Sequence, residues 1–331
     1  MIECIFTIDY EIYGNGQGSL RELVYEPAER LKELFLKWDA RFVNFIEVAE
    51  LEMIEANRTD AAIDLVKNQI LDFYRNGFEI GLHLHPQWYN ARYENGRWLL
   101  DYSEYSLCAL PKERMERIIN RSIEYLRKTL DEPGFIPFSF RNSNWLFQPS
   151  QPLARILADH GIKLDSSVFK GGFQHKIQLD YRRALKNGYY WKFNRDVNVP
   201  DPRGTLLEIP THIEMVFLWK MCNKKRVKLQ QVASSSYSFK SKLDRLKDFV
   251  RIRQPLKLDF CRLTLTELTG MLDQVIKEDK KDPESFKPIV AIGHSKDLID
   301  FDTVESFLGY LRNKYIHIST FEEVYKKCAW S

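Results

Sequence analysis

Two rhythms of apolar residues alternate along the chain: short, nearly continuous apolar runs, and longer stretches with apolar residues at helical spacing. The first rhythm predicts buried strands and the second predicts amphipathic helices. The predicted strands cover residues 2–9, 42–46, 78–86, 135–141, 162–165, 206–210, 289–294 and 316–319. The predicted helices cover residues 26–38, 60–76, 111–130, 151–160, 264–278, 302–314 and 320–328.

A strand followed by a helix, repeated at this rhythm, is typical of parallel strands joined by crossover helices. We therefore predict an α/β fold. Polar residues cluster where the predicted strands end, which is the edge that carries the active site in an α/β barrel and in an open doubly wound sheet. These residues are Asp9, Glu11, His83, His85, Arg141 and Asp165.

The regular pattern is interrupted between residues 170 and 260. From Lys220 to Lys257 the chain has twelve Lys and Arg residues against two Asp. We interpret 215–260 as an inserted basic subdomain, helical in structure, within a single domain that spans 1–331. A basic run of this kind is either a solvated helical face or a surface that docks onto an anionic membrane or a substrate bearing a polyphosphate.

Composition and charge limit the partners and the cellular compartment that we expect for this protein. The formal net charge of +3 is too small to indicate a nucleic-acid partner. The five cysteines are scattered and lack CxxC spacing, which argues against a disulfide framework or a cysteine metal site and fits a reducing compartment. The first residues contain neither a basic leader nor a long apolar run, so we expect a cytoplasmic protein. The basic segment adds the expectation of peripheral contact with the inner membrane face.

His83 and His85 lie two apart in a predicted strand, so their side chains point the same way. Two imidazoles that converge on one point are suitable ligands for zinc, iron, nickel or copper. Asp9 and Glu11 have the same spacing at the end of the first strand. One carboxylate can bind a metal while the other acts as a general base. The alternative interpretation is two unrelated histidines, and acids that merely cap a helix or a loop.

Three further residues follow predicted strands. Arg141 can hold a carboxylate in its ionised form through paired hydrogen bonds. His294 can titrate near neutral pH and serve as a general acid. Asp165 can orient such a histidine or simply cap the next turn. The alternatives are a surface arginine and a hydrogen-bonded histidine of the core.

In their joint order these features resemble the polysaccharide deacetylase family, the NodB-homology or carbohydrate esterase 4 group. That family has an acidic motif after the first strand, then a histidine, an arginine and an aspartate motif, and a late histidine. The corresponding segments are Thr7-Ile8-Asp9-Tyr10-Glu11, Glu79-Ile80-Gly81-Leu82-His83-Leu84-His85, Phe140-Arg141, Leu164-Asp165-Ser166-Ser167 and Ile292-Gly293-His294. The resemblance spans about 1–170 and 204–330 and implies a distorted (β/α) barrel of about seven parallel strands.

The resemblance also implies a role for each residue. Asp9 would be the catalytic base, Arg141 would tether it, and His294 would be the general acid. Glu11 and His83 would bind a divalent metal, zinc by expectation. The second histidine ligand of the family follows the first by four or five residues; Gln87 occupies the four-residue position here, which leaves His85 for that role.

The expected activity is therefore removal of an acetyl or formyl group from an N-acylated amino sugar. Without a leader, the enzyme would act on a nucleotide-linked or lipid-linked sugar, in the assembly of envelope polysaccharide or lipopolysaccharide. Two alternatives remain open. One is a barrel glycosidase that uses two carboxylates, Asp9 with Asp165 or Glu47. The other is a non-catalytic relative that binds carbohydrate.

Overall fold

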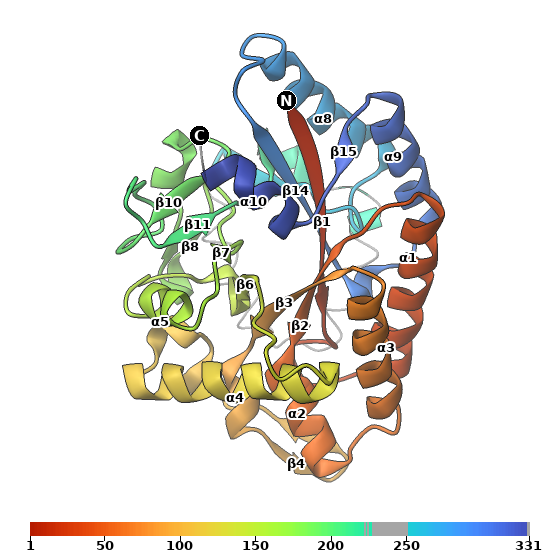
Figure 1. Ribbon diagram of the computed structural model, residues 1–331, viewed down its shortest axis with the longest axis vertical. Helices are drawn as coiled ribbons and strands as arrows, with labels where there is room; N and C mark the ends of the chain where they lie inside the picture. The colour runs from red at the N-terminus through yellow and green to blue at the C-terminus, as the bar shows by residue number, and fades with distance from the viewer. Residues whose placement is uncertain (222, 224, 227–250, 330–331) are drawn as a thin grey trace.

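The computed structural model describes residues 1–221, 223, 225–226 and 251–329 (Figure 1). Its main feature is a nine-stranded sheet. All neighbouring strands in it are parallel, except that the edge strand, β10, is antiparallel to its neighbour, β11. The order is β10 (Trp191–Phe193), β11 (Leu206–Glu208), β7 (Leu164–Asp165), β6 (Ser139–Asn142), β3 (Glu79–Leu84), β2 (Val43–Glu47), β1 (Ile2–Tyr10) and β14 (Lys287–His294), with β15 (His317–Ile318) also paired to β1.

The sheet curls into a distorted barrel. Thr211, which follows β11, forms isolated parallel bridges to Phe169 and to Val290 of β14. The backbone N–H of His212 donates to the carbonyl oxygen of Val290 at 3.0 Å. The chain beyond β11 therefore meets the opposite edge of the sheet, and the predicted distorted barrel of parallel strands is confirmed.

Two apolar cores form because successive residues of a strand point to opposite faces of the sheet. Ile5, Phe45 and Val290 belong to a smaller core, to which Phe321 of α10 (Phe321–Ala329) also contributes. Phe6 belongs to the larger core, which includes the buried faces of the surrounding helices. Both faces of the parallel strands are thus buried, as their nearly continuous apolar runs predict.

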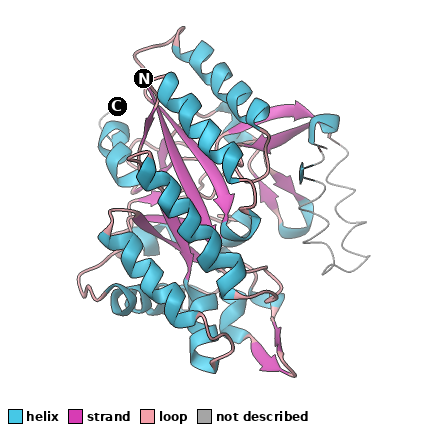
Figure 2. Cartoon of the chain, turned by 90° about the vertical axis from the view of Figure 1, so that its right-hand side faces the viewer, coloured by secondary structure: helices cyan, strands magenta, loops and turns pink. Residues whose placement is uncertain are grey.

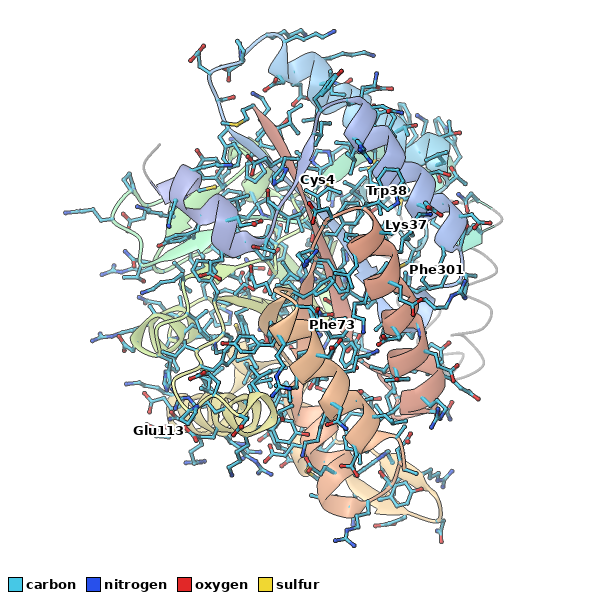
Figure 3. All side chains as sticks on the ribbon, turned by 45° about the vertical axis from the view of Figure 1, so that its right-hand side comes forward. Cys4, Lys37, Trp38, Phe73, Glu113 and Phe301 are labelled. Carbon is cyan, nitrogen blue, oxygen red and sulfur yellow. The ribbon has the colours of Figure 1, made fainter. Side chains whose placement is uncertain are left out.

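Helices lie over the outer face of the sheet (Figures 1 and 2). Phe73 of α3 is fully buried beneath its helix, whereas Glu113 of α4 points to solvent (Figure 3). The helices are α1 (Glu26–Lys37), α2 (Val48–Asn57), α3 (Ile63–Arg75), α4 (Lys112–Leu130), α5 (Leu153–Asp159), α8 (Leu265–Asp279) and α9 (Phe301–Asn313), together with α10.

The helices predicted between residues 26 and 160 and between 264 and 328 are all present, whereas α2 was not predicted. It follows β2 without an intervening turn, so the apolar strand pattern runs directly into it. Glu47 is the last residue of β2 and also caps α2, because its side chain accepts a hydrogen bond from the backbone N–H of Glu50 at 3.3 Å. This junction places Glu47 at the mouth of the barrel.

Three short antiparallel pairs of strands lie outside the main sheet in the described part of the chain. They are β4 (Arg92–Glu94) with β5 (Arg97–Leu99), β8 (Phe173–Gln174) with β9 (Leu179–Asp180), and β12 (Ile213–Phe217) with β13 (Arg253–Lys257). The last pair forms the described ends of the basic segment 215–260. These ends are strands where a helix was predicted, because they lie opposite each other and pair their backbones. The helical structure predicted for 215–260 falls outside the described residues over 227–250.

No helix in the described ranges is both long enough and apolar enough to cross a membrane.

Glu79 is a buried carboxyl at the start of β3. It accepts hydrogen bonds from the Ser139 hydroxyl at 2.7 Å and from the backbone N–H of Glu322 at 2.9 Å. Burial outweighs these bonds and raises the pKa of Glu79 to about 7. The folded protein therefore holds this proton at pH values where the unfolded chain has lost it, and stability falls as the pH rises towards 7.

We predict that Glu79→Gln removes this part of the loss of stability with rising pH. The amide does not titrate, and it can still form hydrogen bonds with the Ser139 hydroxyl and with the backbone N–H of Glu322. The free energy of unfolding of Glu79→Gln relative to wild type should rise by roughly 3 kcal/mol between pH 5 and pH 8. Urea titrations in chelator would measure it. The exposed Glu113→Gln is the matched control, and an equal shift in both variants would contradict the assignment.

Candidate active site

The barrel register brings the predicted residues together at the carboxyl ends of the strands. Asp9 of β1 is paired with His294 of β14. His83 of β3 lies between its two paired neighbours, Glu47 of β2 and Arg141 of β6. Side chains from strands far apart in sequence thus converge because parallel strands end at one edge.

Asp9 is a buried carboxylate held by a buried guanidinium. Its Oδ1 lies 2.6 Å from Nη1 of Arg141, and its Oδ2 lies 3.4 Å from Nε2 of His294. Burial alone would raise the pKa of Asp9, but the charge of Arg141, followed by those of His83 and His294, lowers it below its ordinary value. Asp9 is therefore ionised and can accept a proton.

Arg141 is itself fixed on several sides. Its Nη2 donates to the Thr7 hydroxyl at 3.0 Å and its Nε donates to the carbonyl oxygen of Ser166, also at 3.0 Å. The ring of Phe45 lies 4.1 Å from the guanidinium carbon. The arginine predicted as the tether of Asp9 is thus immobilised by strands β1 and β2 and by the loop after β7.

The second group is a cluster of imidazoles and carboxylates. Glu11 Oε2 lies 3.6 Å from His83 Nε2 and 3.4 Å from His85 Nδ1. His85 Nδ1 also lies 2.7 Å from Glu47 Oε2. One donor atom from each of these four residues lies within 4.8 Å of all the others. Two imidazoles with carboxylates form a ligand set that suits zinc and other divalent transition metals.

The tautomer of His83 fits a ligand role. His83 Nδ1 lies 2.8 Å from the carbonyl oxygen of Arg141, and a carbonyl can only accept, so this nitrogen carries the proton of a neutral ring. Nε2 is then the free lone pair that faces Glu11. A backbone carbonyl behind a histidine ligand is a usual orienting partner. Burial disfavours the imidazolium, but Asp9, Glu11 and Glu47 outweigh it and raise the pKa of His83 to about 9. A metal bound at Nε2 would therefore replace a proton at that nitrogen.

Sequence reasoning missed Lys296, which touches the same cluster. Its ammonium lies 2.7 Å from Glu11 Oε1 and donates to the carbonyl oxygen of Ile12 at 2.9 Å. Burial opposes ionisation of Glu11, but Lys296 and then His85 and His83 bring the pKa of Glu11 well below its ordinary value. The sequence suggests Glu47 only as a catalytic carboxylate in the glycosidase alternative, and not as a metal ligand. Its signal as a ligand is its place at the end of a predicted strand.

His294 follows Gly293, at which any larger residue would collide with the neighbouring loop. A Cβ there would lie 2.5 Å from Phe260 and 2.7 Å from Cys261. The glycine therefore lets this loop pack against the end of β14. Burial lowers the pKa of His294 to about 4, so its ring is neutral at pH 7.

Asp165 is not placed against His294. Its carboxylate accepts from the Ser167 hydroxyl at 2.6 Å and pairs with the carboxyl group of Glu208. The acid on the Nδ1 side of the His294 ring is instead Asp297, whose Oδ2 lies 3.9 Å from Nδ1. Asp297 is held by Arg262 through bonds of 2.9 and 2.5 Å. The spacing of three residues from His294 is the sequence signal that could have indicated Asp297.

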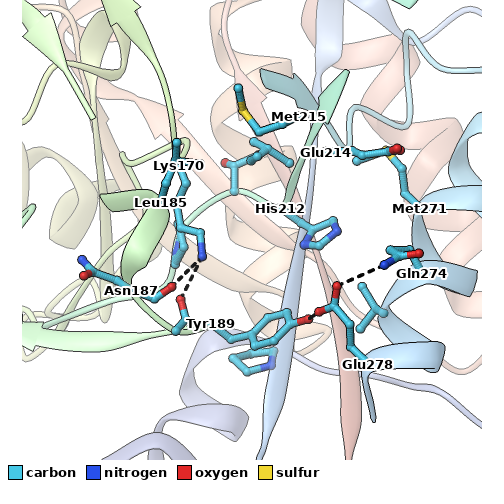
Figure 4. Close-up of a pocket in the computed structure, with 16 residues that line it drawn as sticks. Lys170, Leu185, Asn187, Tyr189, His212, Glu214, Met215, Met271, Gln274 and Glu278 are labelled. Atoms are coloured by element: carbon cyan, nitrogen blue, oxygen red, sulfur yellow. Dashed lines mark hydrogen bonds between the residues drawn. The ribbon is translucent and has the colours of Figure 1, made fainter. Parts of the chain in front are cut away.

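A separate cavity of about 630 Å³ lies away from the cluster that contains Glu11, His83 and His85 (Figure 4). His212 lines it, and burial lowers the pKa of His212 to about 4. Lys170 donates to the carbonyl oxygens of Asn187 and Gly188 at 2.8 and 3.2 Å, and the Tyr189 hydroxyl donates to Glu278. His212 is therefore separate from the cluster of Glu11, Glu47, His83 and His85.

Comparison with known proteins identifies the fold. No protein-family model matches the chain, and no curated protein matches it. Among solved structures, the chain is similar to a polysaccharide deacetylase from Mycobacterium smegmatis, with 14% identity and a TM-score of 0.54 over 98% of this chain and 89% of that one.

Two solved structures with other activities are also similar. Puue allantoinase has 12% identity and a TM-score of 0.51 over 99% of this chain and 90% of that one. A GH57-type branching enzyme from Pyrococcus horikoshii has 10% identity and a TM-score of 0.55 over 98% and 70%. The chain therefore has the barrel of the polysaccharide deacetylases over nearly its whole length, and the predicted resemblance is confirmed for the fold.

We predict that the cluster binds one zinc ion per chain. His83→Ala combined with His85→Ala should lower the affinity for zinc by at least about 100-fold, because even partners behind the ligands typically contribute 10- to 100-fold. Elemental analysis and competition with a fluorescent chelator would measure this. The exposed His317→Ala is the control. Stoichiometric zinc in the double variant would reject these ligands.

Proposed function

We propose that this protein is a metal-dependent hydrolase that removes an acetyl or formyl group from the nitrogen of an amino sugar. The observation that carries the proposal is the juxtaposition of two groups at the barrel mouth. One is the ionised carboxylate of Asp9, fixed by Arg141. The other is the cluster of imidazoles and carboxylates that includes Glu11 and His83. Amide hydrolysis needs both a base and an electrophilic centre.

The residues that would hold the metal are Glu11, His83 and His85, with Glu47 as a fourth donor. A divalent metal bound there supplies Lewis acidity, which lowers the pKa of water and polarises an acyl oxygen. Lys296 leaves Glu11 Oε2 free, because it contacts the other oxygen of the carboxylate. The donor set thus fits zinc, which is the expected metal.

Asp9 is the proposed base. The hydrogen bond from Arg141 engages only Oδ1, and Oδ2 faces His294. Asp9 Oδ2 is therefore available to take the proton of a water molecule that attacks the amide carbon. Positioned general bases typically contribute about 10²- to 10⁴-fold in rate.

His294 is the proposed acid. It is neutral at rest, and its Nε2 lies 3.4 Å from the Asp9 oxygen that takes up the proton. The proton can pass across this separation to His294 and then to the leaving nitrogen, so the amine departs neutral. Asp297 behind Nδ1 would stabilise the transient imidazolium. We assign Asp165 no direct part, since its carboxylate is engaged by Ser167 and Glu208.

The proposed setting is the cytoplasmic face of the inner membrane, where nucleotide-linked or lipid-linked sugars are assembled into envelope polysaccharide or lipopolysaccharide. The basic segment 215–260 supports this setting. At its described ends Trp219 and Ile252 are 67% and 74% exposed, next to Arg253. Exposed aromatic and apolar groups beside basic ones suit an anionic membrane surface.

We predict that Asp9→Asn lowers kcat for release of acetate or formate by about 10²- to 10⁴-fold while zinc remains bound, because the amide cannot accept the proton. Coupled detection of the released acid, with N-acetylated and N-formylated amino sugars as substrates, measures kcat. Elemental analysis of the same preparation measures zinc. Asp64→Asn, which is exposed on α3, is the control.

Turnover of Asp9→Asn within threefold of wild type would reject the base assignment. Cleavage of glycosidic bonds that persists in chelator would favour the glycosidase alternative, which needs only two carboxylates. Sugar binding without release of an acyl group, with any divalent metal, would favour the non-catalytic alternative.

A further inference from the structure

A lysine that the proposed mechanism does not use lies beside the active site. Lys257 is the last residue of β13, and its ammonium nitrogen lies 3.7 Å from the ring centre of Trp145 and 4.2 Å from that of Phe169. The two rings are in edge-to-face contact, with centres 6.0 Å apart. They belong to the loops that follow β6 and β7, so they wall the mouth of the barrel.

Lys257 interacts electrostatically with the proposed catalytic pair, Asp9 and Arg141. The ring of Trp145 that it faces also lies 5.1 Å from the guanidinium carbon of Arg141. Burial lowers the pKa of Lys257 to about 7; the charge of Asp259 opposes this shift and that of Arg262 adds to it, and Asp9 and Arg141 have the same two effects more weakly. Asp259, two residues on, bridges to Ile292 near the end of β14. The ring of Trp145 thus lies between the ammonium of Lys257 and the guanidinium that holds Asp9, within 5.1 Å of each.

The ammonium has no carboxylate partner within 4.0 Å among the residues that the structure describes. This distinguishes it from Lys296, which is paired with Glu11. Two aromatic rings offset only part of the cost of desolvating an ammonium. A lysine with a purely structural role in this position would gain from a carboxylate, whereas one that binds an anionic ligand must keep its charge available.

We propose that Lys257, Trp145 and Phe169 form an anion subsite, and that the preferred substrate is an N-acyl amino sugar bearing a carboxylate or a phosphate. The inference rests on the proposed deacylase function and specifies its substrate class. The sugar ring would lie against the aromatic rings, and its anionic group would accept hydrogen bonds from the ammonium. Lys257 is thereby a specificity-determining residue.

The test measures binding rather than turnover, in the zinc-loaded Asp9→Asn protein. Calorimetry compares N-acetylglucosamine, N-acetylglucosamine 1-phosphate and the uronic acid of N-acetylglucosamine. We expect one or both anionic ligands to bind at least about tenfold more tightly than the neutral sugar, as expected of a hydrogen bond to a charged group. The two anionic ligands distinguish a phosphate from a carboxylate as the source of the charge.

Lys257→Met in the same background should abolish the preference for the anionic ligand, and Lys257→Arg should keep most of it. Lys314→Met is the matched control, because Lys314 also lies near a ring, that of Tyr310 at 5.5 Å. A preference that survives Lys257→Met, or a parent protein that binds all three ligands equally or not at all, overturns the subsite. A preference that depends on Lys257, in a wild-type protein that releases no acyl group, would instead overturn the proposed function.

Discussion

The buried guanidinium of Arg141 is the interaction on which the site depends. It is fully buried, its side chain holds Asp9, and its backbone carbonyl fixes the ring of His83. One residue thus orients both the proposed base and a proposed metal ligand. The cost of burying its charge is offset by the opposite charge of Asp9 and by hydrogen bonds to Thr7 and Ser166. Without it, the buried charge of Asp9 would lose the cation that stabilises it most.

Several buried acidic side chains lie at the barrel mouth, and their pKa values are shifted in opposite directions. Asp9 and Glu11 face cations and stay ionised. Glu50 and Glu208 form no ion pair within 4.0 Å among the described residues, and burial, followed by neighbouring carboxylates, raises the pKa of each well above its ordinary value. The charged carboxylates are therefore those that face the centre of the mouth. The neutral ones support the backbone around it, as Glu50 does by accepting from the N–H of Ile12 at 2.9 Å.

The fold by itself does not select a reaction. Similar barrels occur in a polysaccharide deacetylase, an allantoinase and a GH57-type branching enzyme. The choice of reaction rests instead on the chemistry placed at the strand ends. An ionised base beside a set of imidazoles and carboxylates favours hydrolysis of an amide. The ammonium of Lys257, which has no carboxylate within 4.0 Å among the described residues, favours an acidic substrate. Both follow from side chains on loops and strand ends that the barrel holds rigidly.

The sequence alone determined the parallel α/β barrel and most of the groups at its mouth. Buried parallel strands have a strong apolar signature, and residues two apart on a strand, such as His83 and His85, must share a face. Only the tertiary structure decided the partners. Glu47 joins the cluster, Lys296 meets Glu11, and Asp297 rather than Asp165 lies beside His294. The contact between Lys296 and Glu11 and the place of Glu47 depend on strand register and on long side chains from separate strands, which local patterns do not encode. The spacing of Asp297 from His294 is local, but only the fold shows that the two side chains face each other.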